Sequence, residues 1–276
     1  MNRRGLTLHR AALGLAGVTG LVYAAMLASL LRDGWPLLSW RFLLGLPREL
    51  EAGGGVAPEI LNTFSMVMMA MAVIAPLGLA VAVQRVEYGR DVWWTRELDR
   101  WSRVFLSVPG IVVGLVAYRV LVAELGWPVS ILTGTVALAV LNWPFVAVSA
   151  GDALAGVPES LREGSLALGT TRWQTWLFAV LPEALPSLVN GLGLAAARMI
   201  GESAALIFTA GVNVSPHWGL AAPGETLAVH LWYIRTEGLM PDATGQAAAT
   251  GIVLLGLVIA LLWASQRLAL WLERRH

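Results

Sequence analysis

Long apolar stretches recur along the chain, separated by shorter polar segments. About 20 helical residues, at about 1.5 Å each, cross the roughly 30 Å hydrocarbon core of a bilayer. Windows of this length predict six membrane-spanning helices at residues 11–31, 60–83, 104–125, 131–150, 188–209 and 247–265. The pattern therefore predicts an all-α integral membrane protein with six transmembrane helices.

The first apolar stretch, residues 11–31, follows Arg3 and Arg4 and so has some features of a signal peptide. Its apolar run is longer than a usual signal core, and no small-residue cleavage site of the usual form follows it. We expect a retained helix. Residues 1–58 are then an N-terminal helix with its outer segment, and residues 59–276 form the main membrane domain.

The distribution of arginine predicts the orientation of the chain in the membrane. Arg32, Arg41, Arg48 and Arg235 are on one side of the predicted spans, Arg119 and Arg198 are within spans, and the remaining arginines are on the other side. Segments rich in Lys and Arg stay in the cytoplasm. The sequence therefore predicts that both termini and the loop at residues 157–186 are cytoplasmic, in a multi-pass protein of a bacterial plasma (inner) membrane.

Composition excludes several classes of function. The chain is 57% hydrophobic and 13% charged, so part of its apolar surface must contact lipid. All 19 basic residues are arginine, so the chain lacks the lysine of a phosphate-binding P-loop and cannot itself be a P-loop ATPase. It has no cysteine, and its net charge of +1 gives no basis for binding nucleic acid.

The loop at residues 157–186 lies between the fourth and fifth predicted spans, and its first half is too polar to stay in lipid. Pro158 suits the first turn of a helix, and Gly169 suits a left-handed residue that ends one. The pattern predicts a short helix, a turn at Gly169, and a second helix that begins near Thr170. We expect Pro182 and Pro186 to end this second helix before the next span.

This loop resembles the EAA loop of bacterial ABC-importer permeases, in which Glu163, Gly169, Leu181 and Pro182 have counterparts. Gly164 and Ser165 stand in place of the two alanines, and Ala179 stands in place of a larger aliphatic residue. The resemblance implies a coupling helix between spans 4 and 5 that binds a separate ATPase subunit, as in type I ABC importers. The coupling residues that it implies are Glu159, Arg162, Glu163, Ala167, Gly169 and Pro182. The alternative is an amphipathic loop that only caps two membrane helices.

Two charged residues, Arg198 and Glu202, interrupt the fifth predicted span. A charge at the bilayer centre costs about 2.5–3.5 kcal/mol on insertion scales, so both must face protein or water. At helical spacing they share a stripe of small or polar residues with Gly191, Ala195, Ala205 and Thr209. One interpretation is an ion pair between residues four apart that only stabilises packing. The other is a site on a translocation path, where the planar guanidinium of Arg198 binds an oxyanion.

The segment from Ala167 to Gly211 also resembles phosphate ABC-transporter permeases of the PstA type. Arg198, Gly201 and Glu202 match, while Ser203 and Ala205 replace Thr and Pro; VEY (residues 86–88), SVPGIVVGL (107–115) and TLAVHLWYI (226–234) match as well. The resemblance implies a path site at Arg198, Glu202 and Ser203. It also implies a related permease as heterodimer partner, two P-loop ATPase subunits that use ATP, and an extracytoplasmic phosphate-binding protein. A protonated phosphate can donate a hydrogen bond to Glu202, whereas sulfate cannot, so the pair favours inorganic phosphate.

Other functions remain open at this point. A permease of the same architecture could carry another oxyanion, such as molybdate or sulfate, and an ion-coupled transporter or channel would need no ATPase. The sequence shows no Ser-His-Asp arrangement, carboxylate pair or metal-ligand cluster, so we expect no catalytic site, no metal and no cofactor in this chain. His217 and His230 are expected to be ordinary surface or interface residues.

Overall fold

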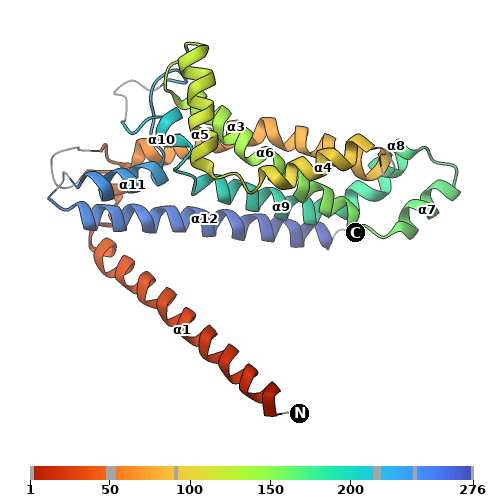
Figure 1. Cartoon of the computed structure of the whole chain (residues 1–276), viewed down its shortest axis with the longest axis horizontal. Helices are drawn as coiled ribbons and strands as arrows, with labels where there is room; N and C mark the ends of the chain where they lie inside the picture. Colours follow the sequence, from red (N-terminus) through yellow and green to blue (C-terminus); the bar gives the residue numbers. More distant parts are fainter. Residues whose placement is uncertain (1–2, 48–53, 90–92, 214–218, 239–240, 275–276) are drawn as a thin grey trace.

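The computed structural model describes residues 3–47, 54–89, 93–213, 219–238 and 241–274, and every regular element in these ranges is a helix. Four long helices form the body: α3 (Ala57–Val83), α6 (Ile131–Ala155), α9 (Leu181–Ile200) and α12 (Ala243–Glu273). They lie side by side, with α3 packed on α6, and α9 packed on both α6 and α12 (Figure 1). Buried side chains such as Met66, Ile74, Leu138 and Met199 fill the space between them.

Shorter helices occupy the two ends of this body and its flank. The α-helices are α2 (Trp40–Leu44), α4 (Trp93–Phe105), α5 (Gly110–Ala117), α7 (Glu159–Ala167), α8 (Arg172–Thr175), α10 (Leu206–Thr209) and α11 (Leu227–Glu237). Four short segments directly follow α-helices. After α1 (Arg3–Gly34) comes the 3-10 turn η1 (Trp35–Leu37), and after α3, α5 and α8 come the π-helical segments η2 (Gln84–Tyr88), η3 (Tyr118–Glu124) and η4 (Trp176–Val180).

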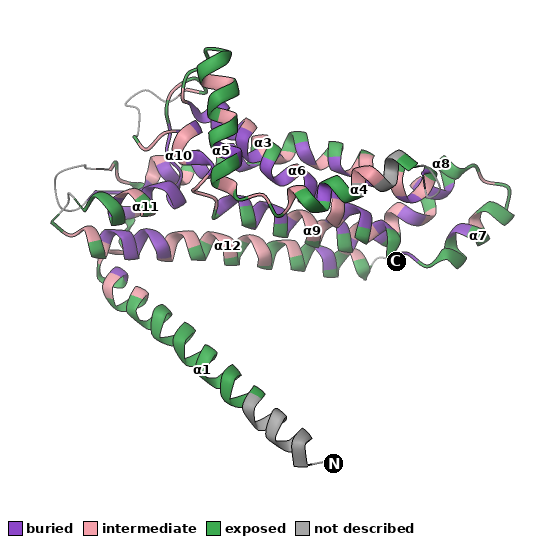
Figure 2. Ribbon diagram, in the orientation of Figure 1, coloured by how far each residue is buried: buried purple, intermediate pink, exposed green. Residues whose placement is uncertain are grey.

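The first helix, α1 (Arg3–Gly34), projects away from the body and touches it only near its own C-terminal end (Figure 1). A Cβ atom at Gly34 would lie 2.6 Å from the backbone of Ala248, so the absence of a side chain allows α1 to meet α12 closely. The rest of its described surface is exposed (Figure 2).

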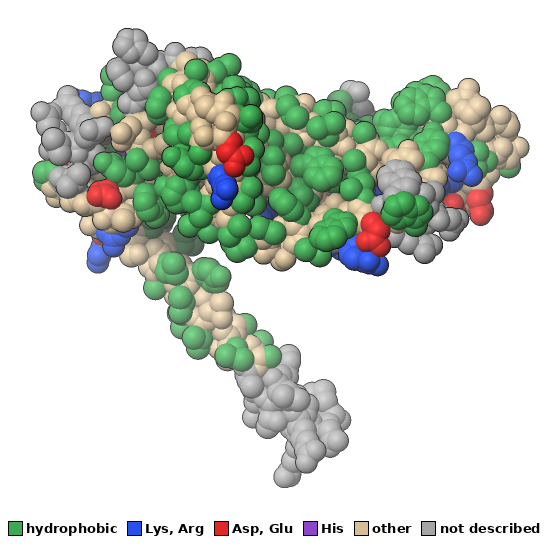
Figure 3. All heavy atoms as spheres, turned by 45° about the horizontal axis from the view of Figure 1, so that its top comes forward, with side chains coloured by type: hydrophobic (Ala, Val, Ile, Leu, Met, Phe, Trp, Pro, Cys, Tyr) green, Lys and Arg blue, Asp and Glu red, His purple; other side chains and the backbone are tan. Residues whose placement is uncertain are grey.

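Five helical runs are long and apolar enough to cross a membrane, and the all-α membrane fold is confirmed. They are Ala12–Leu37, Ala57–Tyr88, Ile131–Ala155, Arg172–Ile200 and Ala243–Glu273. Large apolar side chains such as Phe64, Val140, Ile259 and Trp263 are exposed on the surface of this body. Figure 3 shows hydrophobic side chains over most of one face, as contact with lipid requires.

The prediction of one continuous third span at residues 104–125 is wrong. Helix α4 ends at Phe105, and a new helix, α5, begins at Gly110 and continues through η3 to Glu124. The reason lies at Pro109, which has an extended backbone (φ −60°, ψ 136°) and restricts the residue before it to extended conformations. A helix cannot continue through this point, so the chain turns there.

The fifth span also differs from the prediction, at both of its ends. Pro182 and Pro186 do not end the helix that begins at Arg172; α8, η4 and α9 run continuously through both prolines to Ile200. The wider π turn at η4 directly precedes Pro182 and provides room where a proline ring would clash with a carbonyl one turn earlier. The helix ends at Ile200 and not at Thr209, because the chain breaks at Gly201–Ala205 before the single turn of α10.

Two glycines of α5 pack directly against this break. A Cβ at Gly110 would lie 2.8 Å from Oε1 of Glu202, and a Cβ at Gly114 would lie 2.7 Å from the backbone of Ala205. Glycines four residues apart form a groove on one helix face that permits such close approach in membranes. The contact therefore depends on the absence of both side chains.

We expect Gly114→Leu to destabilise the chain by about 1–3 kcal/mol, because overpacking forces the backbones apart. The midpoint of thermal unfolding in detergent should fall. The control is Gly256→Ala on α12, where a Cβ meets nothing within 4 Å, and this variant should be as stable as the native chain or slightly more so. An unchanged midpoint for Gly114→Leu would contradict the packing described here.

Candidate functional site

The polar loop at residues 157–186 folds as a helix, a turn and a second helix, as the sequence predicts. Helix α7 ends at Ala167, Leu168 is its C-cap residue, and Gly169 follows with a left-handed backbone (φ +85°). The second helix begins at Arg172, where the side chains of Thr171 and Gln174 form a capping box. These caps satisfy the free backbone donors of the helix start, so the turn is well defined.

Arg162 anchors α7 to the body. Its side chain is buried, and its guanidinium pairs with the carboxylate of Glu87 in η2, with Nη2 3.0 Å from Oε1. It also donates hydrogen bonds to the backbone oxygens of Val157 and Leu154, at 2.7 Å each. Arg162 is one of the six coupling residues implied by the resemblance, and its burial means that it acts by positioning α7.

The other implied coupling residues lie mostly on the outer surface of this end. Glu159, Glu163, Ala167 and Gly169 are exposed, whereas Pro182 is half-buried within the continuous helix.

Apolar side chains are exposed beside them. Leu168 is 87% exposed, Trp173 55% and Leu166 43%, on α7, α8 and the turn between them, which lie at one end of the body (Figure 2). An apolar surface flanked by carboxylates is typical of a contact with another protein.

Arg198 and Glu202 are close in sequence but do not form an ion pair with each other, although the structure describes both residues. Arg198 lies on the last turn of α9 and is exposed, with its guanidinium 5.7 Å from the centre of the Phe145 ring. Glu202 lies beyond the helix end, in the break, and is half-buried. The interpretation as a self-neutralising pair at helical spacing is therefore wrong, because α9 ends at Ile200 between the two residues.

The break holds the Glu202 carboxylate by one of its oxygens. Oε1 accepts a hydrogen bond from the backbone nitrogen of Ala205 (3.3 Å) and lies against Gly110. The backbone oxygen of Ser203 accepts hydrogen bonds from the nitrogens of Leu206 and Ile207, which begin α10. The structure thus brings Arg198, Glu202 and Ser203 to the same end of α9.

Sequence reasoning missed three ionisable residues that meet inside the body. The expectation for His230 is wrong, because its side chain is buried and its Nδ1 lies 2.5 Å from Oε1 of Glu225 and 3.7 Å from Oε1 of Glu59. Burial lowers the pKa of the His230 imidazole, but the hydrogen bond and charge of Glu225, with the charge of Glu59, outweigh burial and raise this pKa overall. His217 lies outside the described residues.

A signal for this cluster was present in the sequence. Glu59 stands at the start of a strongly apolar span, where an acid needs a partner, and His230 is the only basic residue in the apolar run from Leu227 to Ile234. Gly110 and Gly114 were also missed as a pair, although their spacing is that of helix-packing glycines in membranes.

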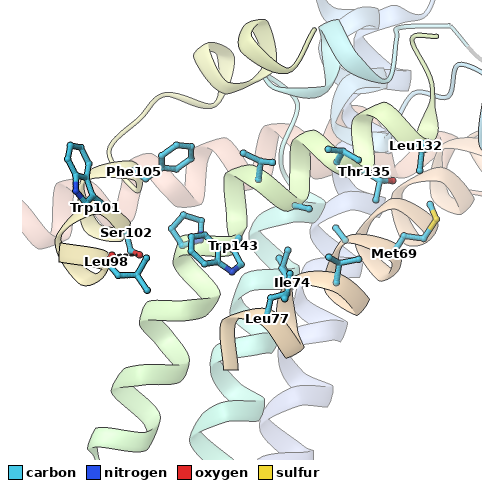
Figure 4. A pocket seen from close by; sticks show the side chains of 16 residues that line it. Met69, Ile74, Leu77, Leu98, Trp101, Ser102, Phe105, Leu132, Thr135 and Trp143 are labelled. Carbon is cyan, nitrogen blue, oxygen red and sulfur yellow. Dashed lines mark hydrogen bonds between the residues drawn. The ribbon is translucent and has the colours of Figure 1, made fainter. Parts of the chain in front are cut away.

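An apolar groove of about 670 Å³ lies between α3, α4 and α6 (Figure 4). Met69, Ile74, Trp101, Phe105 and Trp143 line it. Such a lining suits an acyl chain or an apolar helix, and it offers an anion no charged donor. The groove is therefore not a candidate for an oxyanion path.

The chain is similar to several bacterial permeases. It is 34% identical over 268 residues to the probable ABC transporter permease protein YqgI of Bacillus subtilis. The matched residues cover 91% of this chain and 90% of that protein. It is 34% identical over 221 residues to the phosphate transport system permease protein PstA of Yersinia pestis, covering 78% of this chain and 72% of PstA. PstA 2 of Mycobacterium tuberculosis is 31% identical over 256 residues, covering 91% and 82%.

Solved structures share the fold. The inward-facing MetNI methionine ABC transporter aligns with a TM-score of 0.63 and 23% identity, covering 79% of this chain and 94% of that chain. A bacterial alginate ABC transporter aligns with a TM-score of 0.71 and 12% identity, covering 97% and 95%. Both similarities concern the fold alone.

The family model described as "Binding-protein-dependent transport system inner membrane component" matches residues 74–275, which include α7, the break after α9 and α12. With its multi-pass apolar helices and these relatives, the chain belongs to this family and is the permease subunit of a binding-protein-dependent ABC importer.

Proposed function

We propose that the chain is the permease subunit of an ATP-driven importer of inorganic phosphate, in which it forms half of the translocation path. It performs no bond chemistry. Its partners are a related permease, two P-loop ATPase subunits and an extracytoplasmic phosphate-binding protein. Residues 59–276 form the permease domain, and residues 1–58 add an N-terminal helix.

The single observation that carries this proposal is the exposed guanidinium of Arg198 on an apolar membrane helix. Among the described residues it has no ion-pair partner, and its guanidinium lies over the ring of Phe145. A cation in this position must be compensated by water, by another subunit or by a passing anion. The forked donors of a guanidinium match the oxygens of a phosphate.

Glu202 supports phosphate among the oxyanions. Only its Oε1 has a hydrogen bond among the described residues, to the nitrogen of Ala205, so Oε2 can accept another. Phosphate still carries a proton at neutral pH and can donate it to this oxygen, whereas sulfate and molybdate carry none. Relatives named as phosphate permeases at 31–35% identity agree with this choice.

Orientation in the membrane follows from the arginine distribution, with both termini and α7 in the cytoplasm. The exposed surface of Leu166, Leu168 and Trp173 would then contact the ATPase, and Glu163, Ala167 and Gly169 would lie at its border. Arg162 would hold this surface in place through Glu87. The transporter's cycle would move α7 and the helix that follows it.

We expect Arg198→Gln to reduce phosphate uptake by the assembled transporter roughly ten- to hundredfold, because hydrogen bonds to a charged group contribute about 1.5–3 kcal/mol. Basal ATP hydrolysis, measured separately, should be retained. The matched control is Arg267→Gln, since Arg267 also lies over an aromatic ring, 5.1 Å from the centre of Trp263. Uptake at the native rate in Arg198→Gln would refute the path site.

For anion selectivity, uptake of labelled phosphate should be inhibited by arsenate, which also carries a proton, and not by sulfate or molybdate. Glu202→Gln should reduce this discrimination, because an amide can donate a hydrogen bond to a fully deprotonated anion. Inhibition by sulfate or molybdate but not by arsenate would identify the chain as a permease for another oxyanion. Uptake without any ATPase would instead indicate an ion-coupled transporter or channel.

For the ATPase contact, we expect Leu168→Glu to weaken binding of the ATPase subunit roughly tenfold or more, since burial of a leucine side chain contributes about 1.5–3 kcal/mol. Co-purification of the subunits measures this, and the thermal midpoint of the chain itself should not change. Leu220→Glu, at another exposed leucine outside the loop, is the control and should leave ATPase binding intact.

Arg162→Met provides the contrasting result for this segment. It leaves the buried carboxylate of Glu87 without its cation, at a cost of about 3–5 kcal/mol, so the thermal midpoint should fall. The additional substitution Glu87→Leu removes the unpaired carboxylate and should restore part of the lost thermal stability. If Arg162→Met abolished ATPase binding at an unchanged midpoint, Arg162 would be a contact residue and not an anchor.

A further inference from the structure

Three ionisable side chains from separate segments meet at the end of the body that carries α11. Glu59 lies in the first turn of α3, Glu225 lies in the loop before α11, and His230 lies on α11. Their nearest ligand atoms, one from each residue, all lie within 4.8 Å of one another. The side chains are 0%, 4% and 4% exposed, so water does not solvate them.

The neighbouring polar groups hold the backbone of this cluster and leave the Glu59 carboxylate unsatisfied. Thr63 donates to the backbone oxygen of Glu59 and accepts from the nitrogen of Leu227, and Asn62 donates to the backbone oxygen of Glu225. Both carboxylate oxygens of Glu59 are buried and have no hydrogen-bond partner among the described residues. An unsatisfied buried carboxylate is costly, so its position indicates a missing positive ligand.

Charge balance indicates what that ligand is. When both carboxylates are ionised, the cluster carries a net charge of −1 even with the imidazole protonated, and either a proton on Glu59 or a bound cation can neutralise it. A divalent cation bound by two carboxylates and a neutral imidazole gives a charge of zero. Nitrogen and carboxylate oxygen together are a ligand set of first-row transition metals, and zinc binds both at about 2.0–2.2 Å.

We propose that Glu59, Glu225 and His230 bind one divalent transition-metal cation, with zinc as the representative ion. The ligand atoms already converge, with Nδ1 of His230 2.5 Å from Oε1 of Glu225 and 3.7 Å from Oε1 of Glu59. The ion would join the start of α3 to α11, segments that are more than 160 residues apart in the chain. This site is separate from Arg198 and does not depend on which anion the importer carries.

The test compares the native transporter with variants after purification without a polyhistidine tag. Each sample is treated with a chelator, dialysed against zinc and analysed for first-row metals by elemental mass spectrometry. The native chain should hold about one more equivalent of metal than Glu59→Gln or His230→Gln. Metal bound by other subunits is the same in all samples and cancels in this difference. Its thermal midpoint should rise with zinc, because a ligand of the folded state stabilises it. The control, Glu124→Gln, removes an exposed glutamate on η3 and should behave as the native chain does.

Two outcomes would overturn the proposal. One is equal metal content in the native chain, Glu59→Gln and His230→Gln. The other is a thermal midpoint of the native chain that neither the chelator nor zinc changes. If Glu59→Gln is then as stable as the native chain, Glu59 holds a proton, and the three residues form a hydrogen-bonded cluster without metal. The measurements on the native chain decide the matter even if a variant fails to fold.

Discussion

The cost of placing charge in an apolar environment determines much of this structure. A buried or lipid-exposed ion is tolerated only when another charge, a hydrogen-bonded group, water or a ligand compensates it. The chain applies this in three ways. The charge of Arg162 is compensated by Glu87 and two backbone oxygens. The charges of Glu59, Glu225 and His230 are compensated only in part, since the carboxylate of Glu59 has no hydrogen-bond partner among the described residues. The charge of Arg198 has no ion-pair partner among the described residues and lies over the ring of Phe145.

Residues of the sequence motifs that match the permease family make contacts between separate segments of the chain. Glu87, in VEY, pairs with Arg162 of the loop at residues 157–186, and the glycines of SVPGIVVGL pack on the break that holds Glu202. Nδ1 of His230, in TLAVHLWYI, lies 3.7 Å from Oε1 of Glu59 at the start of α3. Each motif therefore contributes one half of a junction between segments that are distant in the chain. Few residue types can make these contacts, because each contact requires either a particular charge or the absence of a side chain.

Sequence patterns predicted the helical membrane fold and the two helices and turn of the loop at residues 157–186, because hydropathy and helix caps act locally. Gly169 is an example, since its left-handed backbone depends only on its own freedom. The failures came from residues whose effect depends on a distant partner or on a local irregularity of the helix that hydropathy does not indicate. Pro182 stays within a helix because a π turn precedes it, Arg162 is buried because Glu87 faces it, and the stripe that contains Arg198 and Glu202 fails because the helix ends between them.

The continuous helix from Arg172 to Ile200 has a mechanical consequence. Its 29 residues give a rod roughly 40 Å long that begins in the loop at residues 157–186 and ends beside Arg198. A flexible linker would absorb a displacement at one end, whereas a helix with no break transmits it to the other. The π turn at η4 interrupts the regular hydrogen-bond pattern of this rod near the loop, so it can serve as a pivot with a short arm toward α7 and a long arm toward Arg198. A small rotation at the loop would thus become a larger sideways movement of the guanidinium.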